Sequence, residues 1–419
     1  MNFQNFKGNL RAISRTETAC RACKSKRIVS FLDLGVTPLA DRLLTSVSEN
    51  EPVFPLNVVF CEECALVQIT ETVAPEILFA DAYPYYSSFS PALLAHAREN
   101  VLEILASRML NDKSLVIELA SNDGYLLKNY KESGIPVLGI DPAEGPAAAA
   151  ECIGVPTLQD FFTLELAEKL CAEGKYADVV HANNVLAHVA DTNGFVRGLR
   201  AILKPNGIAV IEVPYVMSLI DHVEFDTIYH EHLCYFSVTA IDNLFRRHGL
   251  FLNRVKLLKI HGGSLRLFVE PKENVTESVT AQLRLERELG LNRFEFFRDF
   301  SNRVATQKAE LVSLVHELKT QGKRIAAYGA AAKGATLLNY CGLSSKEIDF
   351  VVDRNSYKQG KFMPGAHVPV CDPSALLEEK PDYVLLLTWN FADEIFEQQA
   401  AYRATGGKFI VPVPSPRII

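Results

Sequence analysis

Two CxxC motifs constrain the fold of this chain more than any other feature of its sequence. They are Cys20-Arg-Ala-Cys23 and Cys61-Glu-Glu-Cys64. The spacing lets both thiolates of a motif reach one tetrahedral ion at about 2.3 Å, so the two motifs together predict a single zinc site. Because the protein fills all four positions, no position stays open for a substrate, and the role of the ion should be structural. Four unrelated free cysteines are the alternative, but paired spacing favours a zinc-binding domain, which we expect over residues 1–75.

Length and composition indicate an ordinary multidomain protein. At about 150 residues per domain, 419 residues suggest several domains. The net charge of −7 provides no basic field for nucleic acid. No stretch approaches the roughly 18 to 20 apolar residues that span a bilayer, and the start lacks an apolar signal core. The remaining cysteines are scattered singly, which favours reduced thiols. We therefore expect a cytoplasmic monomer or small homo-oligomer that has no nucleic-acid or membrane partner.

The rest of the chain alternates between strand-like and helix-like segments, which predicts α/β architecture with parallel sheets. Strand-like runs within 114–127, 137–143, 177–189 and 203–214 predict a central doubly wound Rossmann-like sheet, in a domain of residues 76–278. Residues 279–321 are charged and periodic, as in connecting helices. A second alternation over 322–419 predicts a smaller C-terminal Rossmann-like domain.

The turn after the first central strand, ELASNDG, is a candidate cofactor site. It carries Glu118, Ala120, Asn122 and Gly124 at the carboxyl end of the strand, where open α/β sheets bind ligands. Asp141 ends the second strand and is placed to accept hydrogen bonds from ribose hydroxyls. The turn lacks the G-x-G-x-x-G of dinucleotide sites and resembles the first motif of class I S-adenosylmethionine methyltransferases, although Ala120 stands where glycine is common. An ordinary βα turn without a cofactor is the alternative.

Later positions extend this candidate site. Asp160 and Phe161 follow the third apolar segment, where a carboxylate and an aromatic ring suit an adenine. Asn183 and His188 follow a further strand, at the edge where the methyl acceptor would lie.

Residues 226–237, DTIYHEHLCYFS, concentrate groups that transfer protons. Imidazole near neutral pH, oriented by a carboxylate and accompanied by phenols, suits removal of a carbon-bound proton. A second metal site is an alternative, but alternating positions put at most two ligands on one side. Histidines without any chemical role are the other alternative.

Many motifs taken in order resemble one family. The two CxxC pairs, YPYYSSFS, ELASNDGYLL, HANNVLAHV, YHEHLCYFS, HGGSLR, YGAAAKGATLLNY, VVDRN and GGKFIVPVP span nearly the whole chain. Together they are similar to the nucleotide-sugar C-methyltransferases of deoxysugar biosynthesis, of the mycarose and tetronitrose type. The resemblance implies a zinc-binding N-terminal domain, a central S-adenosylmethionine domain, and a C-terminal Rossmann-like domain that helps enclose the nucleotide sugar. It also implies methylation at carbon 3 of a 4-keto-hexose.

The resemblance carries over onto five residues as an active-site cluster: Tyr83, His188, Tyr229, Glu231 and His232. We expect His232 to be the base, Glu231 to orient it, and a phenol of Tyr229 or Tyr83 to contact the enolate oxygen. The expected substrate contacts are Tyr85, Ser87, His261, Gly262, Gly329, Lys333 and Thr336. Of these, Gly329, Lys333 and Thr336 suit a pyrophosphate at a helix start, and a plain strand-to-helix turn is the alternative. The HGGS turn at 261–264 is equally compatible with an ordinary hairpin.

Other functions stay open at this point. A nicotinamide-dependent oxidoreductase would use YGAAAKG as its phosphate turn and Asp353 as its ribose ligand, but it leaves the YHEH segment without a partner. A non-catalytic sugar-nucleotide sensor leaves the same segment idle, and a methyltransferase could act on an acceptor that is not a sugar.

Overall fold

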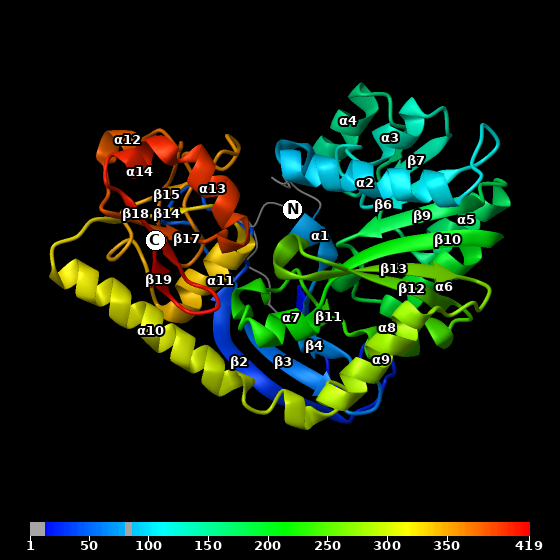
Figure 1. Ribbon diagram of the computed structural model, residues 1–419, viewed down its shortest axis with the longest axis horizontal. Helices are drawn as coiled ribbons and strands as arrows, with labels where there is room; N and C mark the ends of the chain where they lie inside the picture. Colours follow the sequence, from blue (N-terminus) through cyan, green and yellow to red (C-terminus); the bar gives the residue numbers. More distant parts are fainter. Residues whose placement is uncertain (1–12, 80–85) are drawn as a thin grey trace.

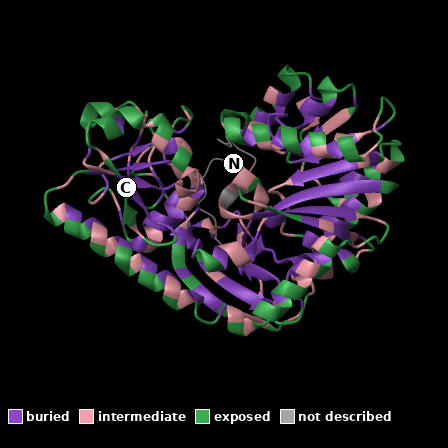
Figure 2. Ribbon diagram, in the orientation of Figure 1, coloured by how far each residue is buried: buried purple, intermediate pink, exposed green. Residues whose placement is uncertain are grey.

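The computed structural model describes residues 13–79 and 86–419. Tyr83 and Tyr85 lie outside the described residues. Three sheet-containing parts are visible in Figure 1, with the C-terminal sheet at the left, the central sheet at the right, and strands β2 to β4 beneath both. In Figure 2 the strands are mostly buried, and exposed positions concentrate on the outer helices. None of the described helices is long and apolar enough to cross a membrane.

The N-terminal part is an antiparallel sheet that includes one strand from far along the chain. Its order is β11-β4-β3-β2, with bounds β2 Ile28–Pro38, β3 Val53–Cys61, β4 Val67–Ile69 and β11 Cys234–Tyr235. Short strands β1 Ser14–Thr16 and β5 Glu71–Val73 pair beside it, before helix α1 Pro75–Phe79. Strand β11 belongs to the YHEHLCY segment, and the Ile69 N–H donates to the Leu233 carbonyl at 3.0 Å. The N-terminal sheet therefore holds the segment predicted to do the chemistry.

The central sheet has seven strands in the order β12-β13-β10-β9-β6-β7-β8. Its parallel strands are β6 Val116–Leu119, β7 Val137–Ile140, β8 Thr157–Leu158, β9 Ala177–Asn183 and β10 Leu203–Pro214. Strand β13 Ser264–Glu270 runs antiparallel to both β10 and β12 Phe251–Leu258. All four residues of β6 are buried, as expected for a strand covered on both faces. This order, with its reversed β13, is the class I methyltransferase fold.

Helices cover both faces of this sheet, and the sequence marks where several of them begin. The helices are α2 Pro91–Ser107, α3 Leu127–Glu132, α4 Glu144–Cys152, α5 Leu164–Ala172, α6 Thr192–Ile202, α7 Val216–Asp221 and α8 Val238–Arg246. Helix α2 has Pro91 in its first turn, and its N-cap Ser90 accepts a hydrogen bond from Leu93 N–H. Thr163, Asp191 and Ser237 cap α5, α6 and α8 in the same way.

Two helices occupy most of residues 279–321: the first packs on the central part, and the second packs on strand β2 of the N-terminal sheet. They are α9 Glu277–Leu289 and the long α10 Phe300–Thr320, which runs along the lower left of Figure 1. The ring of Phe297, just before α10, lies 5.1 Å from that of Phe31 and 4.9 Å from that of Phe60. Buried aromatic contacts thus fix the start of α10 on the N-terminal sheet. The domain boundaries expected from the sequence stay predictions.

The C-terminal sheet repeats the Rossmann arrangement on a smaller scale. Its strand order is β16-β15-β14-β17-β18-β19. The parallel strands are β14 Ile325–Tyr328, β15 Val351–Val352, β16 Val370–Cys371, β17 Tyr383–Leu386 and β18 Lys408–Val411. Strand β19 Arg417–Ile418 runs antiparallel to β18. Helices α11 Ala332–Cys341, α12 Ala375–Glu379, α13 Ala392–Gln398 and α14 Ala400–Ala404 accompany it. The first strand again lies in the middle, so the turn after β14 opens at the carboxyl edge of the sheet.

Candidate functional site

The four cysteines of the two CxxC motifs converge on one point. The Sγ atoms of Cys20, Cys23, Cys61 and Cys64 all lie within 4.8 Å of one another, and the Cys20–Cys64 and Cys23–Cys61 pairs are 3.5 Å apart. Thiolates bound to one tetrahedral zinc at about 2.3 Å are separated by nearly this distance. The donor set and its geometry fit a structural zinc ion. Among the described residues, no other group of three or more such ligands comes together.

Each CxxC motif, called a knuckle from here on, closes with the same backbone turn. The N–H of the residue after the second cysteine donates to the first cysteine's carbonyl, from Lys24 to Cys20 at 3.0 Å and from Ala65 to Cys61 at 2.9 Å. Lys24 and Ala65 both have positive φ, 63° and 60°. The first knuckle is also bound to the central part, because Asn193 Nδ2 donates to the carbonyls of Arg21 and Ala22 at 2.9 and 3.0 Å.

The turn after β6 wraps around the carboxylate at the end of β7. Asp141 accepts hydrogen bonds from Asn122 N–H and Ala143 N–H, both at 2.8 Å. Three residues of the turn have positive φ: Ala120 at 51°, Asn122 at 50° and Gly124 at 75°. Ala120, the departure from the usual glycine, therefore adopts a left-handed conformation that costs an L-residue about 1 kcal/mol or more. The turn keeps the shape that brings its backbone close to a ligand.

Buried polar atoms, several of them carboxylate oxygens, gather at this edge of the sheet. Among the described residues, no hydrogen-bond partner is found for Glu118 Oε2, Ser121 Oγ, Asp123 Oδ1 or Asn183 Oδ1, all buried. Burial, and then the nearby Asp141 and Asp123, raise the pKa of Glu118 well above its usual value. Free acceptors among carboxylates suit ribose hydroxyls and a cationic ligand, whereas a pyrophosphate would be repelled. These residues therefore fit S-adenosylmethionine, which carries a sulfonium and an ammonium, better than a dinucleotide.

Ser87, predicted to contact substrate, lies against the cofactor turn. It begins a short 3-10 helix, Ser87–Phe89, whose backbone covers the turn from outside. Ser87 N–H donates to Asn122 Oδ1 at 2.9 Å, and Ser88 N–H donates to Asp123 Oδ2 at 3.1 Å. The observed role of this segment is therefore to hold side chains of the cofactor turn.

The pair predicted to contact adenine follows β8, next to the strand that carries Asp141. Asp160 is exposed, and its Oδ1 accepts from Phe161 N–H at 2.8 Å, while Phe161 is half-buried. The neighbouring Phe162 packs instead on Phe195, at 5.4 Å between ring centroids. Asp160 and Phe161 therefore stay accessible beside the cofactor turn.

Tyr229 and His232 form a hydrogen-bonded pair within the YHEH segment. His232 Nδ1 lies 2.9 Å from the Thr227 carbonyl, and His232 Nε2 lies 2.9 Å from the Tyr229 hydroxyl. Because a carbonyl only accepts, Nδ1 carries the proton of the neutral ring, and Nε2 accepts from the phenol. Both side chains are half-buried, and their rings stack at 4.1 Å. The ring is thus held in the tautomer that leaves Nε2 basic.

The orienting partner of His232 differs from the prediction. We expected Glu231 in this role, but the Thr227 carbonyl fills it. Residues 229–232 form a turn, closed by His232 N–H donating to the Tyr229 carbonyl at 2.9 Å, which brings the Tyr229 and His232 side chains together. Glu231 is buried, and burial followed by the charge of Asp41 raises the pKa of its carboxyl. Its backbone carbonyl accepts from Nδ1 of His188 at 2.6 Å. Glu231 therefore lies beside the pair and acts on His188 through its main chain.

His188 completes the cluster, whereas His230 is turned away from it. The His188 ring lies 4.7 Å from the His232 ring at 61°. Burial lowers the pKa of His188 to about 4, against the opposing effect of the Glu231 and Asn184 backbone, so the ring is neutral at pH 7. His230 is fully buried, its Nε2–H donates to the Pro55 carbonyl at 3.1 Å, and its ring packs on Phe54. His230 is a core residue without a place in the cluster.

The C-terminal turn is built like the cofactor turn. Asp353, at the end of β15, accepts from Ala330 N–H and Asn355 N–H, both at 2.8 Å. Gly329 has a φ of 96°, and a Cβ there would lie 2.4 Å from Thr388 Oγ1, so only glycine fits. The same acid-to-turn arrangement therefore occurs once in each Rossmann-like unit.

The remaining predicted substrate contacts lie where the central and C-terminal parts meet. Lys333 Nζ donates to Asn390 Oδ1 at 3.0 Å. Thr336 is buried and donates to the Ile228 carbonyl at 3.2 Å, so its hydroxyl docks α11 on the segment before Tyr229, and its pyrophosphate role stays a prediction. Gly262 has a φ of 85°, and a Cβ there would lie 2.5 Å from Glu224 Oε1. The side chain of His261 lies outside the described part.

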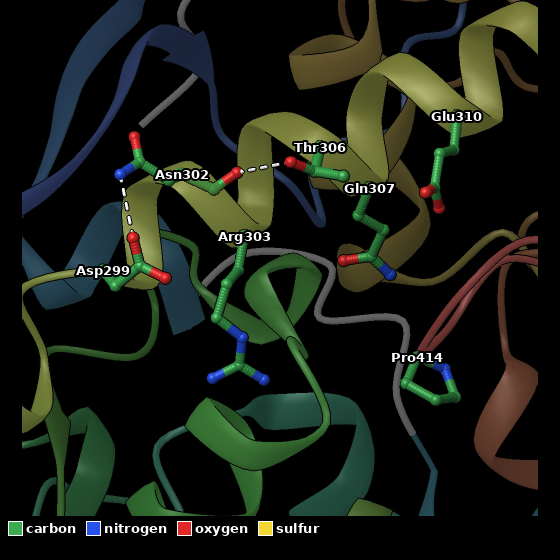
Figure 3. A pocket seen from close by; sticks show the side chains of 7 residues that line it. All are labelled: Asp299, Asn302, Arg303, Thr306, Gln307, Glu310 and Pro414. Atoms are coloured by element: carbon green, nitrogen blue, oxygen red, sulfur yellow. Dashed lines mark hydrogen bonds between the residues drawn. The ribbon is translucent and has the colours of Figure 1, made fainter.

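Two surface cavities accompany these features. One of about 240 Å³ lies between α10 and Pro414, and Figure 3 shows Arg303 and Gln307 on this side of the helix. It contains none of the predicted site residues. A larger cavity of about 620 Å³ borders the cofactor turn at Asp123 and is bridged by Tyr86 and Tyr357, whose rings stack at 5.6 Å and 17°. This contact joins the central and C-terminal parts above the cavity.

Comparisons with known proteins agree with this architecture. Residues 20–79 match a family described as "Putative zinc binding domain", residues 91–253 a "Methyltransferase domain", and residues 259–414 a "C-methyltransferase C-terminal domain". The C-methyltransferase NovU of Streptomyces niveus is 36% identical over 413 residues, which cover 97% of this chain and 98% of that protein.

Other proteins match a smaller share of the chain. The ubiquinone biosynthesis O-methyltransferase of Bartonella tribocorum is 29% identical over 128 residues, 29% of this chain and 52% of that protein. The solved magnesium protoporphyrin IX methyltransferase of Synechocystis PCC 6803, with bound S-adenosylmethionine, is 14% identical with a TM-score of 0.33, over 42% of this chain and 79% of that one. From the full-length match and the three family matches, the chain belongs to the C-methyltransferase family, as an S-adenosylmethionine-dependent enzyme with a zinc-binding N-terminal region.

Proposed function

We propose that this enzyme methylates carbon 3 of a nucleotide-activated 4-keto deoxysugar by way of an enolate. The observation that carries the proposal is the Tyr229–His232 pair, in which Nδ1 of the imidazole is committed to a carbonyl and Nε2 accepts from a phenol. A carbon next to a ketone loses a proton only if a base and a donor to the developing oxyanion act together. The pair supplies both groups within one short segment.

In the proposed reaction, His232 and Tyr229 each have a separate role. His232 Nε2 takes the proton from carbon 3, the electron pair of that C–H bond forms a double bond between carbons 3 and 4, and the π pair of the carbonyl moves onto the ketone oxygen. The Tyr229 hydroxyl, released from Nε2 by the new proton, donates to the resulting enolate oxygen. S-adenosylmethionine, when bound, would supply an electrophilic methyl group for carbon 3 and would leave as the neutral thioether S-adenosylhomocysteine. The protonated His232 keeps its Nδ1–H on the Thr227 carbonyl and returns its other proton to solvent.

Two features support a nucleotide sugar as the substrate. The turn after β14, with Asp353 bound to two backbone N–H groups, repeats the ribose-binding arrangement proposed for Asp141. Helix α11, which follows that turn, also contacts the segment that carries the base through Thr336. A nucleoside held at Asp353 would therefore leave its sugar near Tyr229 and His232. The sequence resemblance to deoxysugar C3-methyltransferases supports the same substrate class.

The test is methyl transfer by the wild type and by His232→Asn. The wild type is incubated with a thymidine-diphosphate 4-keto-6-deoxyhexose and methyl-labelled S-adenosylmethionine, and mass spectrometry follows the sugar. A positioned general base contributes about a hundred- to ten-thousandfold, so His232→Asn should lose turnover on that scale. Calorimetric affinity for S-adenosylmethionine should stay unchanged, because His232 is absent from the cofactor turn.

Proton exchange separates the base from later steps. With S-adenosylhomocysteine bound no methyl can move, and solvent deuterium should enter carbon 3 in the wild type but not in His232→Asn. Rapid exchange and normal turnover in that variant would contradict the assignment, and His188→Asn would then be the next variant. Methyl transfer only to a ketone that is not a sugar, or micromolar binding of NAD in place of S-adenosylmethionine, would contradict the proposed substrate or cofactor site.

A further inference from the structure

The segment that orients His232 is anchored by the C-terminal part of the chain. It is the 3-10 turn Phe225–Thr227 together with Ile228. Trp389 Nε1–H, from the C-terminal part, donates to Asp226 Oδ2 at 2.7 Å, and Thr336 Oγ1–H donates to the Ile228 carbonyl at 3.2 Å. Between these two anchors lies Thr227, whose carbonyl accepts the hydrogen bond from His232 Nδ1. The direction of that carbonyl thus depends on contacts made from another sheet.

Asp226 is a strong anchor because it is an acid enclosed by the protein. Its side chain is fully buried, and its Oδ1 accepts no hydrogen bond from the described residues. Burial raises the pKa of Asp226, and the charge of Lys333 and the Trp389 hydrogen bond act against this rise. The hydrogen bond from Trp389 is therefore costly to lose, because it goes to a buried carboxylate.

Trp389 is itself held on its other side. Lys333 Nζ lies 4.6 Å from the centroid of the indole, in a cation–π arrangement, and donates to the side chain of the adjacent Asn390. The indole therefore contacts both Asp226 of the central part and Lys333 of α11. Helix α11 follows the turn of Gly329 and Asp353, so the anchor and the proposed nucleoside site share one element.

We propose that Trp389 and Asp226 are positioning residues that fix the tautomer of His232 through the Thr227 carbonyl. The local hydrogen bonds of the turn run from Thr227 N–H and Oγ1–H to the Glu224 carbonyl and from Ile228 N–H to the Phe225 carbonyl, and none of these involves the Thr227 carbonyl. When the indole is docked, the carbonyl points at Nδ1 and Nε2 stays basic. When it is undocked, either ring nitrogen can carry the proton. This inference rests on the proposed function, in which His232 is the base, and it makes base activation depend on docking of the C-terminal part.

The test compares Trp389→Phe with a control at another interdomain contact. Phenylalanine keeps an aromatic ring for Lys333 but removes the N–H donor, and Asp226→Asn keeps an uncharged acceptor and should have a smaller effect. Glu51→Ala is the control, because Glu51 joins the N-terminal and C-terminal parts by accepting from Gly365 N–H at 2.7 Å and does not touch residues 226–232. The ten histidines are labelled with ¹⁵N, and His232→Asn identifies the His232 signals.

The expected result for Trp389→Phe is a loss of the single Nδ1–H tautomer of His232. A misplaced base typically costs about ten- to a hundredfold, so turnover should fall on that scale while KM for the ketosugar and S-adenosylmethionine affinity change little. The His188 signals, set by the Glu231 carbonyl, should stay in place. Because Trp389 is the one tryptophan of the chain, its emission should also shift in Asp226→Asn.

Two results would overturn the inference. One is an unchanged His232 tautomer and unchanged turnover in Trp389→Phe. The other is an equal loss of turnover in Glu51→Ala, which would indicate general domain docking. The base assignment is judged separately: if His232→Asn keeps wild-type turnover, the proposed function fails, while the tautomer spectrum of Trp389→Phe still decides whether Trp389 positions His232.

Discussion

Asp141 is the residue on which the cofactor site depends most directly. Its carboxylate already accepts two backbone hydrogen bonds, which fix its position for ribose hydroxyls. Replacing it by alanine removes a charge-assisted acceptor, so we expect Asp141→Ala to weaken S-adenosylmethionine binding by roughly 1 to 3 kcal/mol. Isothermal titration calorimetry with S-adenosylmethionine measures this change.

The C-terminal unit offers a matched control for this prediction. Asp353 has the same two backbone hydrogen bonds in the second Rossmann-like unit. Asp353→Ala should therefore cost similar folding stability but leave S-adenosylmethionine affinity unchanged, and it should raise KM for the nucleotide sugar. Equal losses of cofactor affinity in both variants would show that the effect comes from the fold and not from ribose contact.

At the scale of single residues, side chains that follow strands were predictable and backbone partners were not. Asp141 could be placed because the ends of parallel strands meet at one edge and ligands bind there. The cluster of Tyr229 and His232 could be placed because both lie in one short segment. The Thr227 carbonyl could not, since every residue carries the same group and only the folded turn decides where it points.

Among the elements, the 3-10 turn at Phe225 and helix α11 meet through a set of charged groups that responds to pH. Glu224 is buried beside Lys333, and burial, opposed by His222 and Lys333, raises its pKa from 4.5 to about 7. The folded protein therefore holds a proton that the unfolded chain releases near pH 4.5. The contribution of this proton to the free energy of unfolding is fully present below pH 4.5 and is lost as the pH rises through 7.

We expect Glu224→Gln to remove this dependence. The shift in pKa corresponds to about 3 kcal/mol, so the variant should gain about that much unfolding free energy relative to the wild type between pH 4.5 and pH 8. Urea denaturation at several pH values measures the difference. Glu49→Gln is a control in which the change in unfolding free energy with pH should have the opposite sign, because the Thr45 hydroxyl lowers the pKa of Glu49. Parallel pH profiles for the wild type and Glu224→Gln would contradict the assignment.

The same elements show where the sequence was insufficient. The small residues of YGAAAKG predict a strand-to-helix turn, and the structure has one there. Glycine is needed at position 329 because a Cβ at that position would clash with Thr388. The pyrophosphate role of Thr336 stays a prediction, and the hydrogen bond from its hydroxyl to the Ile228 carbonyl shows that another segment packs on this helix. Whether another segment covers it depends on contacts more than a hundred residues away in the chain, which local patterns do not encode.

In the molecule as a whole, the zinc-binding region supports the proposed active site through the sheet that it completes. Strand β11, which follows His232 in the chain, pairs with β4 of the N-terminal sheet, and β4 follows the second knuckle. Asn243 of α8 donates to the Cys64 carbonyl at 3.3 Å, and Asn193 of α6 binds the first knuckle. The cofactor turn makes its hydrogen bonds to β7 and to the Ser87 segment instead.

Loss of zinc should therefore damage catalysis more than cofactor binding. We expect one zinc per chain by metal analysis, because four thiolates converge on one point. Cys61→Ser should lose the metal and lower the melting temperature, since the binding energy of a structural zinc is folding energy. It should also reduce turnover strongly while S-adenosylmethionine still binds, because β11 loses its support and the cofactor turn does not. Cys152→Ser, at an exposed cysteine, is the matched control and should keep zinc, stability and turnover. Zinc-free native protein, or a Cys61→Ser variant with wild-type melting and turnover, would show that the knuckles do not support the active site in this way.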